Sequence, residues 1–355
     1  MNVYMVTNGY HGCCYPRLML PAFHNGFILD RQGVDYPLDE IDKVKFDLDG
    51  ADVVVFHRPE DPTYYNLAKM LKKDGKKIVM DNDDTFKISF HPLANFMPDA
   101  KESMLRERDK AIDKFLKIAD LVTTTTKTLA DEYKKINKNT IILPNCVDPI
   151  DWDEPLRNES KKVRIGLVGS AALEYDYKQI KDVLKKLSDR KDVQLFMFGL
   201  GDKEHRKANP KVVKLFKDDY AFWDSLDIEH EQWCLISDYP KKLNEARLDM
   251  MLIPRKDNYF NRCKSNIKFM EAAMCEVPVI AQSFSDGPYE EITHGINGVL
   301  IKDNKHWEHE IDLMIDDKDF RRTMGKNAKE YVLNNYNIEV RAQEWETAYS
   351  KLYED

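Results

Sequence analysis

The segment Asn261–Gln282 reads NRCKSNIKFMEAAMCEVPVIAQ, and its pattern decides how the rest of the chain is interpreted. It begins with three cations in eight residues, continues as an apolar segment, and ends in the strand-like run VPVIA. A helix from about Lys264 to Met274 would place Lys264, Lys268 and Glu271 within about 60° of one another, because each residue turns the helix by about 100°. The segment therefore predicts a helix with an apolar face and an organised polar stripe, followed by a strand.

The polar stripe is suited to a nucleotide. The amino end of a helix together with lysines favours a diphosphate, because both present positive charge to the ligand. Glu271, lower on the same stripe, could accept hydrogen bonds from both hydroxyls of a ribose. The alternative is a solvated helix face with ordinary lysine–glutamate pairing, and spacing alone does not separate the two interpretations.

Length and composition limit the class of protein. A chain of 355 residues is too long for one ordinary core, so two domains are expected. The formal net charge of −8 argues against a general polyanion binder, although it leaves a local basic groove open. The six cysteines lack CxxC spacing and predict neither a zinc site nor a disulfide framework. The N-terminal sequence does not resemble a signal peptide and no apolar run is long enough to span a membrane, so we expect a cytoplasmic protein.

Strand-like segments alternate with helical ones, such as 99–118 and 127–137, along the whole chain. The first series of strand-like segments comprises 2–7, 51–57, 76–82, 119–126 and 139–145, and the second comprises 163–170, 193–200, 248–255, 277–282 and 297–301. Alternation of this kind, with β-branched runs buried on both faces, predicts parallel sheets. Two such series predict two Rossmann-like domains with a cleft between them.

Four segments resemble parts of the retaining glycosyltransferases of GT-B fold, especially family 4. KFMEAAMCEVPVIA (268–281) followed by EEITHGINGVLI (290–301) resembles their donor-binding motif. The segment 119–152 resembles the end of the N-terminal domain and the linker, VRIGLVGS (163–170) resembles the first strand and glycine loop of the donor domain, and 327–355 resembles the terminal helices. KSNIK (264–268) resembles a branch of the family found in phage and polysaccharide gene clusters.

The resemblance implies an α/β GT-B fold whose two parallel sheets face a central cleft. It implies an N-terminal Rossmann-like acceptor domain over 1–155 and a C-terminal nucleotide-sugar donor domain over 156–335. The remaining residues, 336–355, are expected to form a C-terminal helix that packs back on the N-terminal domain.

On the donor side, the chain departs from the family pattern in places. Glu271 corresponds to the second of two family glutamates, whereas Cys263 stands at the position of the first. Ser170 follows Gly169 where the family has an arginine and a lysine after the glycine loop, and Glu276 stands where the family prefers glycine. The cations for the diphosphate must then come from elsewhere. The expected donor-binding residues are Gly169, Ser170, Arg255, Arg262, Lys264, Ser265, Lys268 and Glu271.

On the acceptor side, GYHGCCYPRLMLP (9–21) replaces the first glycine-rich loop of the family. Gly12 could let the backbone approach a substrate, and Arg17 begins a helix-like segment directed to the cleft. The alternative for Arg17 is an ordinary surface cation. His57 and Arg58 follow a strand at the same edge, and the alternative for His57 is a histidine satisfied near the core. The expected acceptor-binding residues are Gly12, Arg17, His57 and Arg58.

The acidic cluster in VMDNDDTFKISFHP (79–92) has two interpretations. Asp81 and Asp83 could form the metal-binding DxD of a GT-A enzyme, since paired carboxylates chelate Mn²⁺ or Mg²⁺. The cluster also resembles an acidic motif that faces the acceptor in the GT-B branch, where Asp83 and Asp84 would bind or deprotonate a hydroxyl. His91 loosely matches a family histidine near the reacting sugar, although a lone loop histidine is more often incidental.

The resemblance implies transfer with retained anomeric configuration after the domains close over a nucleotide-diphosphate sugar. The expected catalytic residues are Asp83, Asp84, His91, Lys264 and Lys268. Fixed cations would stabilise the leaving diphosphate, so we expect no cofactor and no metal. The expected partners are a nucleotide sugar and an acceptor, which is a polysaccharide, a lipid-linked sugar, a protein or modified DNA.

Three alternatives stay open at this point. The acceptor could be a hydroxymethylated pyrimidine in phage DNA, with 73–78, 161–166 and 262–268 as a local basic stripe. A sugar epimerase of GT-B fold would be a different enzyme class, but the acceptor-side cluster and the lack of the full epimerase motif disfavour it. A non-catalytic sugar-nucleotide binding protein is compatible with Cys263 and the missing arginine–lysine pair.

Overall fold

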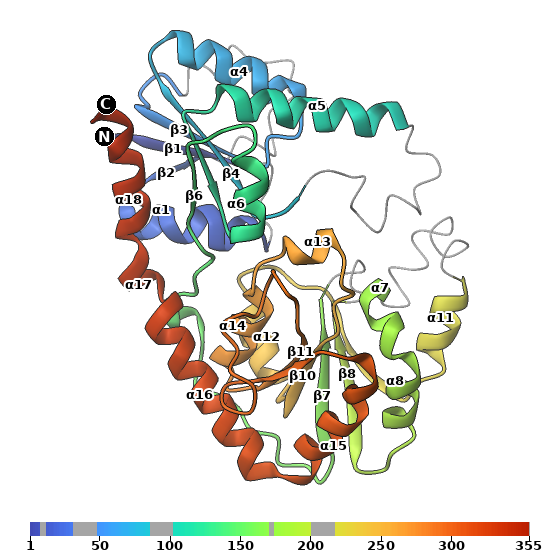
Figure 1. Ribbon diagram of the computed structural model, residues 1–355. Helices are drawn as coiled ribbons and strands as arrows, with labels where there is room; N and C mark the ends of the chain where they lie inside the picture. The colour runs from blue at the N-terminus through green and yellow to red at the C-terminus, as the bar shows by residue number, and fades with distance from the viewer. Residues whose placement is uncertain (8–11, 31–47, 86–101, 170–173, 200–216, 355) are drawn as a thin grey trace.

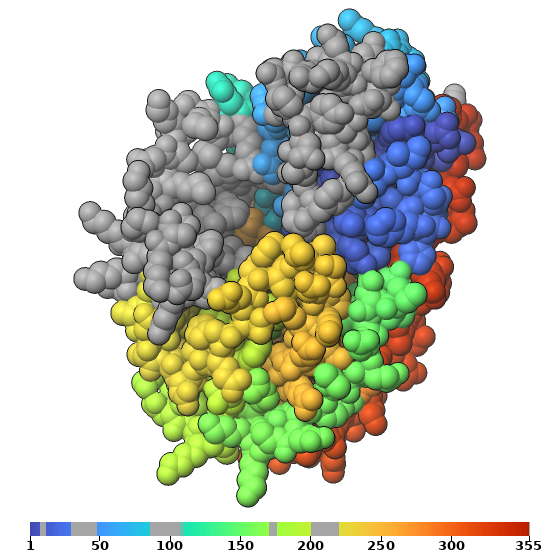
Figure 2. Space-filling view, turned by 180° about the vertical axis from the view of Figure 1, so that it is seen from behind, coloured from blue at the N-terminus to red at the C-terminus, as the bar shows by residue number. Residues whose placement is uncertain are grey.

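The computed structural model describes residues 1–7, 12–30, 48–85, 102–169, 174–199 and 217–354. These residues form two six-stranded parallel sheets with helices around them (Figure 1). Figure 2 shows the two parts in contact, with the C-terminal residues, coloured red, along one edge of both. Within the described ranges, no helix combines the length and the apolarity needed to cross a membrane.

The first sheet has the strand order β2-β1-β3-β4-β5-β6, and all neighbouring strands are parallel. Its strands are β1 (Val3–Val6), β2 (Ile28–Asp30), β3 (Val53–His57), β4 (Lys77–Asn82), β5 (Leu121–Thr124) and β6 (Thr140–Ile142). Its helices are η1 (Tyr15–Met19), α1 (Leu20–Asn25), α4 (Pro62–Lys73), α5 (Glu102–Ile118) and α6 (Lys127–Tyr133). All residues of β3 and β5 are buried, as expected for strands covered on both faces. The carboxyl ends of β3 and β4 lead into Arg58 and Asp83 at one edge of the sheet.

The second sheet has the order β12-β11-β10-β7-β8-β9 and is also parallel throughout. Its strands are β7 (Val163–Val168), β8 (Val193–Phe198), β9 (Ile228–Glu231), β10 (Met250–Ile253), β11 (Val279–Gln282) and β12 (Val299–Ile301). Its helices are α7 (Glu174–Tyr177), α8 (Lys181–Ser188), α11 (Lys217–Asp224), α12 (Tyr239–Glu245), α13 (Tyr259–Arg262), α14 (Ile267–Met274) and α15 (Trp307–Asp316). The strand order reverses between β7 and β10, so Gly169 and Arg255 flank the switch point, where ligands of such sheets bind.

The C-terminal helices connect the two parts. α16 (Lys318–Tyr336) packs on α14, and α17 (Ile338–Arg341) and α18 (Gln343–Ser350) follow it. Ile338, Trp345 and Tyr349 are fully buried in one core with residues of β1, β3 and β4, beside the first sheet (Figure 1). The end of the chain therefore belongs to the hydrophobic core of the first sheet.

The fold class predicted from the sequence is confirmed, and each of the ten expected strands is present. The strands β2 and β9 were not expected. Both lie at sheet edges, and β9 has the polar sequence IEHE, because an edge strand has fewer neighbours to bury it.

The prediction that the helix begins at about Lys264 is wrong. α13 is capped by Asn258, whose side chain accepts from Asn261 N, and ends at Arg262. α14 begins only at Ile267, because Asn266 has φ −83° and ψ 15°, outside the helical region. Lys264 therefore lies in the turn between two helices and does not share a helical stripe with Lys268 and Glu271.

Candidate active site

The carboxyl edges of the two sheets approach each other around α13, which lies between them in Figure 1. Hydrogen bonds join the two parts here. Thr126 Oγ1 donates to the carbonyl of Cys263 at 3.3 Å, and Asn145 Nδ2 donates to Ser265 Oγ at 2.9 Å. The turn between α13 and α14 therefore contacts the first part of the chain directly.

Lys264 reaches from this turn to the acidic cluster that follows β4. Its Nζ pairs with the carboxylate of Asp84 and lies 4.0 Å from the centroid of the Phe260 ring. Asp84 is oriented from the other side, because its Oδ1 accepts a hydrogen bond of 2.9 Å from Thr85 N. The structure thus brings together a cation expected on the donor side and a carboxylate expected on the acceptor side.

Lys268 and Glu271 form a compact group on the first turns of α14. Lys268 Nζ donates to Glu271 Oε2 at 2.9 Å and to the Tyr239 hydroxyl at 3.1 Å. The Tyr239 hydroxyl donates to the same Glu271 oxygen at 2.8 Å. The lysine–glutamate pair of the solvated-face alternative is therefore present, but it is mostly buried and has a third partner. The sequence around α14 gives no signal for Tyr239, because this residue lies on α12, far from α14 in the chain.

Arg255 is a buried cation at the switch point, two residues after β10. Its Nε donates to the Tyr289 hydroxyl at 3.0 Å, and its Nη1 donates to Asn261 Oδ1 at 3.5 Å. Asp176 Oδ2 lies 3.9 Å from Nη1, and burial raises the pKa of this carboxyl. The sequence offered no local signal for Tyr289 or Asp176, since each reaches Arg255 only through the fold.

The remaining donor-side residues fall into two groups. Arg262 lies at the surface, where it pairs with Asp257 at 2.6 Å and with Asp286 at 3.0 Å. Gly169 follows β7 with φ 154°, a conformation that favours glycine. Ser170 lies outside the described residues.

Arg17 and His57 converge on Asp81 inside the first part. Arg17 is fully buried and binds both oxygens of Asp81, at 3.1 and 2.5 Å, so the surface-cation alternative is wrong. His57 is also buried and its Nδ1 lies 3.1 Å from Asp81 Oδ1. Although burial opposes ionisation, the charge of Arg17 holds the pKa of Asp81 below its ordinary value.

Arg58 and Asp83 form a separate pair nearer the meeting edges. Arg58 Nε donates to Asp83 Oδ1 at 2.7 Å, and the backbone of Arg58 has φ 50°, an uncommon value for a residue with a side chain. Burial opposes the charge of Asp83, but Arg58 holds the pKa of Asp83 well below its ordinary value. Gly12 is exposed, and His91 lies outside the described residues.

The DxD interpretation of Asp81 and Asp83 does not fit the structure. The oxygens of Asp81 already receive hydrogen bonds from Arg17, His57 and Thr123. A metal would have to displace a buried arginine to reach them. Among the described residues, no cluster of three histidine, cysteine or acidic side chains could hold a metal ion.

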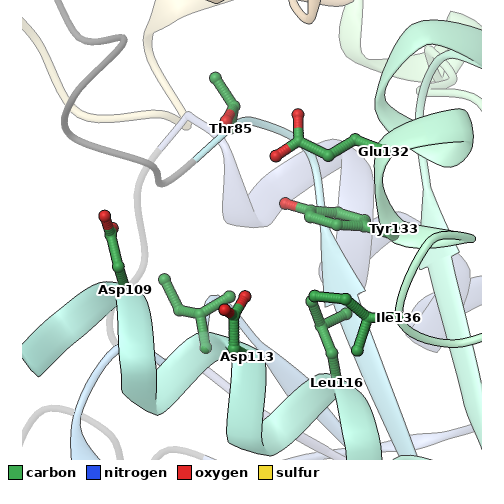
Figure 3. A pocket seen from close by; sticks show the side chains of 8 residues that line it. Thr85, Asp109, Asp113, Leu116, Glu132, Tyr133 and Ile136 are labelled. Carbon is green, nitrogen blue, oxygen red and sulfur yellow. The ribbon is translucent and has the colours of Figure 1, made fainter. Parts of the chain in front are cut away.

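A small cavity lies beside Thr85, between α5 and α6 (Figure 3). Its volume of about 10 Å³ is room for about one water molecule, so it is no substrate pocket. Tyr133 lines it and donates a hydrogen bond of 2.9 Å to the Asp84 carbonyl. The cavity is lined by Thr85, Asp109, Ile112, Asp113, Leu116, Glu132, Tyr133 and Ile136. A larger hollow of about 640 Å³ lies beside α18, at the amino ends of β4, β5 and β6, away from the meeting edges.

A family model described as glycosyl transferase-like matches residues 155–347, more than half of the chain. The chain belongs to the glycosyl transferase-like family. The matched region contains every described residue expected on the donor side, and the resemblance inferred from the sequence is confirmed at this level.

Solved glycosyltransferase structures share the whole GT-B architecture of this family member. Sucrose-phosphate synthase from Thermosynechococcus elongatus has a TM-score of 0.70 at 14% identity, over 99% of this chain and 98% of that chain. HepE of Anabaena in complex with UDP-glucose has a TM-score of 0.68 at 13% identity, over 98% and 99%. An uncharacterized glycosyltransferase of Methanocaldococcus jannaschii is 32% identical over 82 residues, which is 22% of this chain and only 21% of that relative. The two-sheet architecture excludes the GT-A interpretation.

Proposed function

We propose that the protein is a retaining, family 4-type glycosyltransferase that moves a sugar from a nucleotide-diphosphate donor to an acceptor hydroxyl. The contact between Lys264 and Asp84 supports this most. It joins a cation of the proposed donor site to a carboxylate of the proposed acceptor site, at the carboxyl edges of two parallel sheets.

The donor diphosphate would be held by Lys264, Lys268 and Arg255, together with the amino end of α14. These groups would stabilise the charge that develops on the leaving diphosphate. Glu271 would accept hydrogen bonds from the ribose, with its orientation set by Tyr239 and Lys268. HepE, which shares the fold, was solved with UDP and with UDP-glucose, so we propose a uridine diphosphate sugar as the donor.

The acceptor hydroxyl would bind beside Asp83 and Asp84. Because the pKa of Asp83 is held well below its ordinary value, Asp83 is a weak base and is better suited to orienting the hydroxyl. Arg58 would hold Asp83 in place, and Gly12 would leave room for the substrate. The contacts of Arg17 and His57 with Asp81 favour a supporting role for both residues. Ser170 and His91 remain proposed donor and catalytic residues.

The organisation around this site also remains a proposal. We propose an acceptor domain over 1–155, a donor domain over 156–335 and a C-terminal segment over 336–355. We also retain the phage or polysaccharide-cluster branch and a cytoplasmic location. All six cysteines are free thiols, which is compatible with a reducing compartment. The acceptor would be a polysaccharide, a lipid-linked sugar, a protein or hydroxymethylated DNA.

A donor panel tests the function. We expect one of UDP-, GDP-, CMP- and dTDP-sugars, and UDP-glucose first, to raise the melting temperature, because binding to the folded state stabilises it. Release of UDP should then depend on one class of acceptor. Lys268→Ala should slow transfer, because it removes about 2–4 kcal/mol of transition-state stabilisation. Binding without any UDP release across the acceptor panel would favour the non-catalytic alternative.

A chelation assay tests the absence of a metal from the mechanism. Transfer should survive EDTA, because the proposed site assigns the diphosphate to fixed cations and Asp81 is occupied by Arg17. Initial rates are to be compared with and without EDTA and after adding Mn²⁺. Complete loss restored by Mn²⁺ would contradict the proposed mechanism.

A further inference from the structure

We infer that Asn145 is a positioning residue that directs the hydroxyl proton of Ser265 toward the donor diphosphate. This inference rests on the proposed function and deepens it, because it adds a residue from the connection after β6 to the donor site. Asn145 and Ser265 are both buried, with exposed fractions of 3% and 9%. Their side chains meet where the two parts of the molecule touch.

The starting point is the rigid position of Arg17. Its guanidinium binds both oxygens of Asp81 and donates to the carbonyl of Leu143, and Thr123 Oγ1 donates to Asp81 Oδ2 at 2.6 Å. A guanidinium with these fixed partners has little freedom to turn. Its Nη1 also lies 3.5 Å from Asn145 Oδ1.

Arg17 then determines which way the Asn145 amide faces. A guanidinium has only donors, so the amide oxygen must face it and the amide nitrogen must face the other way. That nitrogen donates to Ser265 Oγ at 2.9 Å. Ser265 therefore accepts from Asn145 and has its own proton left to donate.

The proton of Ser265 is available to a bound anion. Among the described residues, the Ser265 hydroxyl makes no hydrogen bond other than the one it accepts from Asn145. Ser265 lies directly after Lys264 and two residues before α14, whose amino end has no side-chain cap. A hydroxyl, a lysine and free helix amides in one turn form a set of donors suited to phosphate oxygens.

Replacing Asn145 by aspartate exchanges the amide group that donates to Ser265 for a carboxylate oxygen, which can only accept. A carboxylate beside Arg17 keeps an acceptor facing the guanidinium, so folding should persist. The Ser265 hydroxyl would then donate to the new carboxylate and lose its hydrogen bond to the diphosphate. Alanine at 145 provides no carboxylate to accept the Ser265 proton, so it leaves the hydroxyl free to rotate toward a phosphate.

The test is a double-mutant cycle with UDP affinity measured by calorimetry. Ser265→Ala should weaken UDP binding about tenfold to a hundredfold, the range for a hydrogen bond to a charged group. Asn145→Asp should weaken it at least as much, and Asn145→Ala much less. In the Ser265→Ala background, Asn145→Asp should reduce UDP affinity markedly less, since only the repulsion between the new carboxylate and the diphosphate remains. Asn334→Asp on the exposed face of α16 is the charge-matched control and should change nothing.

Uridine, followed by ligand-observed NMR, is the phosphate-free probe. Its affinity should stay unchanged in all variants, whereas a merely structural role of Asn145 would weaken uridine and UDP alike and overturn the inference. An equal cost of Asn145→Asp in both backgrounds would also overturn it while leaving the proposed function intact. Failure of the wild-type protein to bind UDP would overturn the proposed uridine donor together with the inference.

Discussion

Asp81 illustrates how a single buried carboxylate organises the acceptor side. It lies at the end of β4, is fully buried, and receives hydrogen bonds from Arg17, His57 and Thr123. A buried ion pair contributes little net stability over apolar packing, but removing one partner leaves an uncompensated charge. The pair therefore fixes the conformation of the cluster more than it stabilises the fold.

Asp81→Asn should destabilise the protein by about 3–5 kcal/mol, because it leaves the Arg17 guanidinium buried without its counter-charge. The double variant Arg17→Met with Asp81→Asn should lose less, since it removes both charges. Unfolding in urea measures these differences. Asp131→Asn, in an exposed pair with Lys127, is the control and should not change stability.

The difference in unfolding free energy between wild type and Asp81→Asn should depend on pH with a definite sign. Although burial raises the pKa of Asp81, Arg17 lowers it, and the folded-state pKa lies below the ordinary value. The stability that ionised Asp81 contributes is therefore present above the unfolded-state pKa of about 3.9 and is lost as the pH falls through the folded-state pKa. The stability gap between wild type and Asp81→Asn should therefore narrow below about pH 4. A gap that widens in acid would contradict this assignment.

At the scale of elements, the position of α14 depends on its contact with α16. Gly325 of α16 lies against the backbone carbonyl of Glu276, which follows α14. Glu276 adopts φ 52° and is held by ion pairs with Arg157 and with Lys329 of α16. The close approach of the two helices thus fixes the end of the helix that carries Lys268 and Glu271.

Gly325→Ala should destabilise the protein, although glycine to alanine in a helix usually stabilises by about 0.5–1 kcal/mol. A Cβ at this position would overlap the Glu276 carbonyl, and overpacking of this kind costs about 1–3 kcal/mol. Thermal unfolding measures the effect, with Asn334→Ala on the exposed face of α16 as the control. A variant as stable as the control would show that α16 can move away from Glu276.

At the scale of the whole molecule, polar contacts among the described residues join the two sheets at the site. Lys264 with Asp84 and Asn145 with Ser265 each join residues from different parts of the chain. In the proposed function, the diphosphate competes with Asp84 for Lys264. Donor binding would then release the carboxylate toward the acceptor, which links occupancy of one half-site to the contacts available in the other.

Asp84→Asn should therefore raise the affinity for UDP, because it frees Lys264 and removes a negative charge near the diphosphate, and it should lower sugar transfer. Asp83→Asn is the matched control. Its partner Arg58 lies in the same part of the chain, so UDP affinity should stay close to wild type. Calorimetry with UDP on both variants measures whether Asp84 competes with the donor for Lys264. Unchanged affinity in Asp84→Asn would mean that the ion pair does not compete with the donor.

The two parallel sheets, the family and the polar segment around Lys264 and Lys268 could be predicted from the amino-acid sequence. Apolar runs and the 261–301 pattern are local signals, and they were sufficient to predict ten strands and the GT-B class. The position of Lys264 outside the helix could not be predicted, since Asn266 interrupts a segment whose apolar periodicity continues through it.

The contacts between distant side chains depend on the tertiary structure. Tyr239 beside Glu271, Asp176 beside Arg255, and Arg17 inside the core against Asp81 all join residues far apart in the chain. No local pattern encodes such contacts, because each depends on strand order and on the register that brings distant ends to one edge. The strands β2 and β9 also needed the fold, since an edge strand takes its conformation from its neighbour more than from its own apolar pattern.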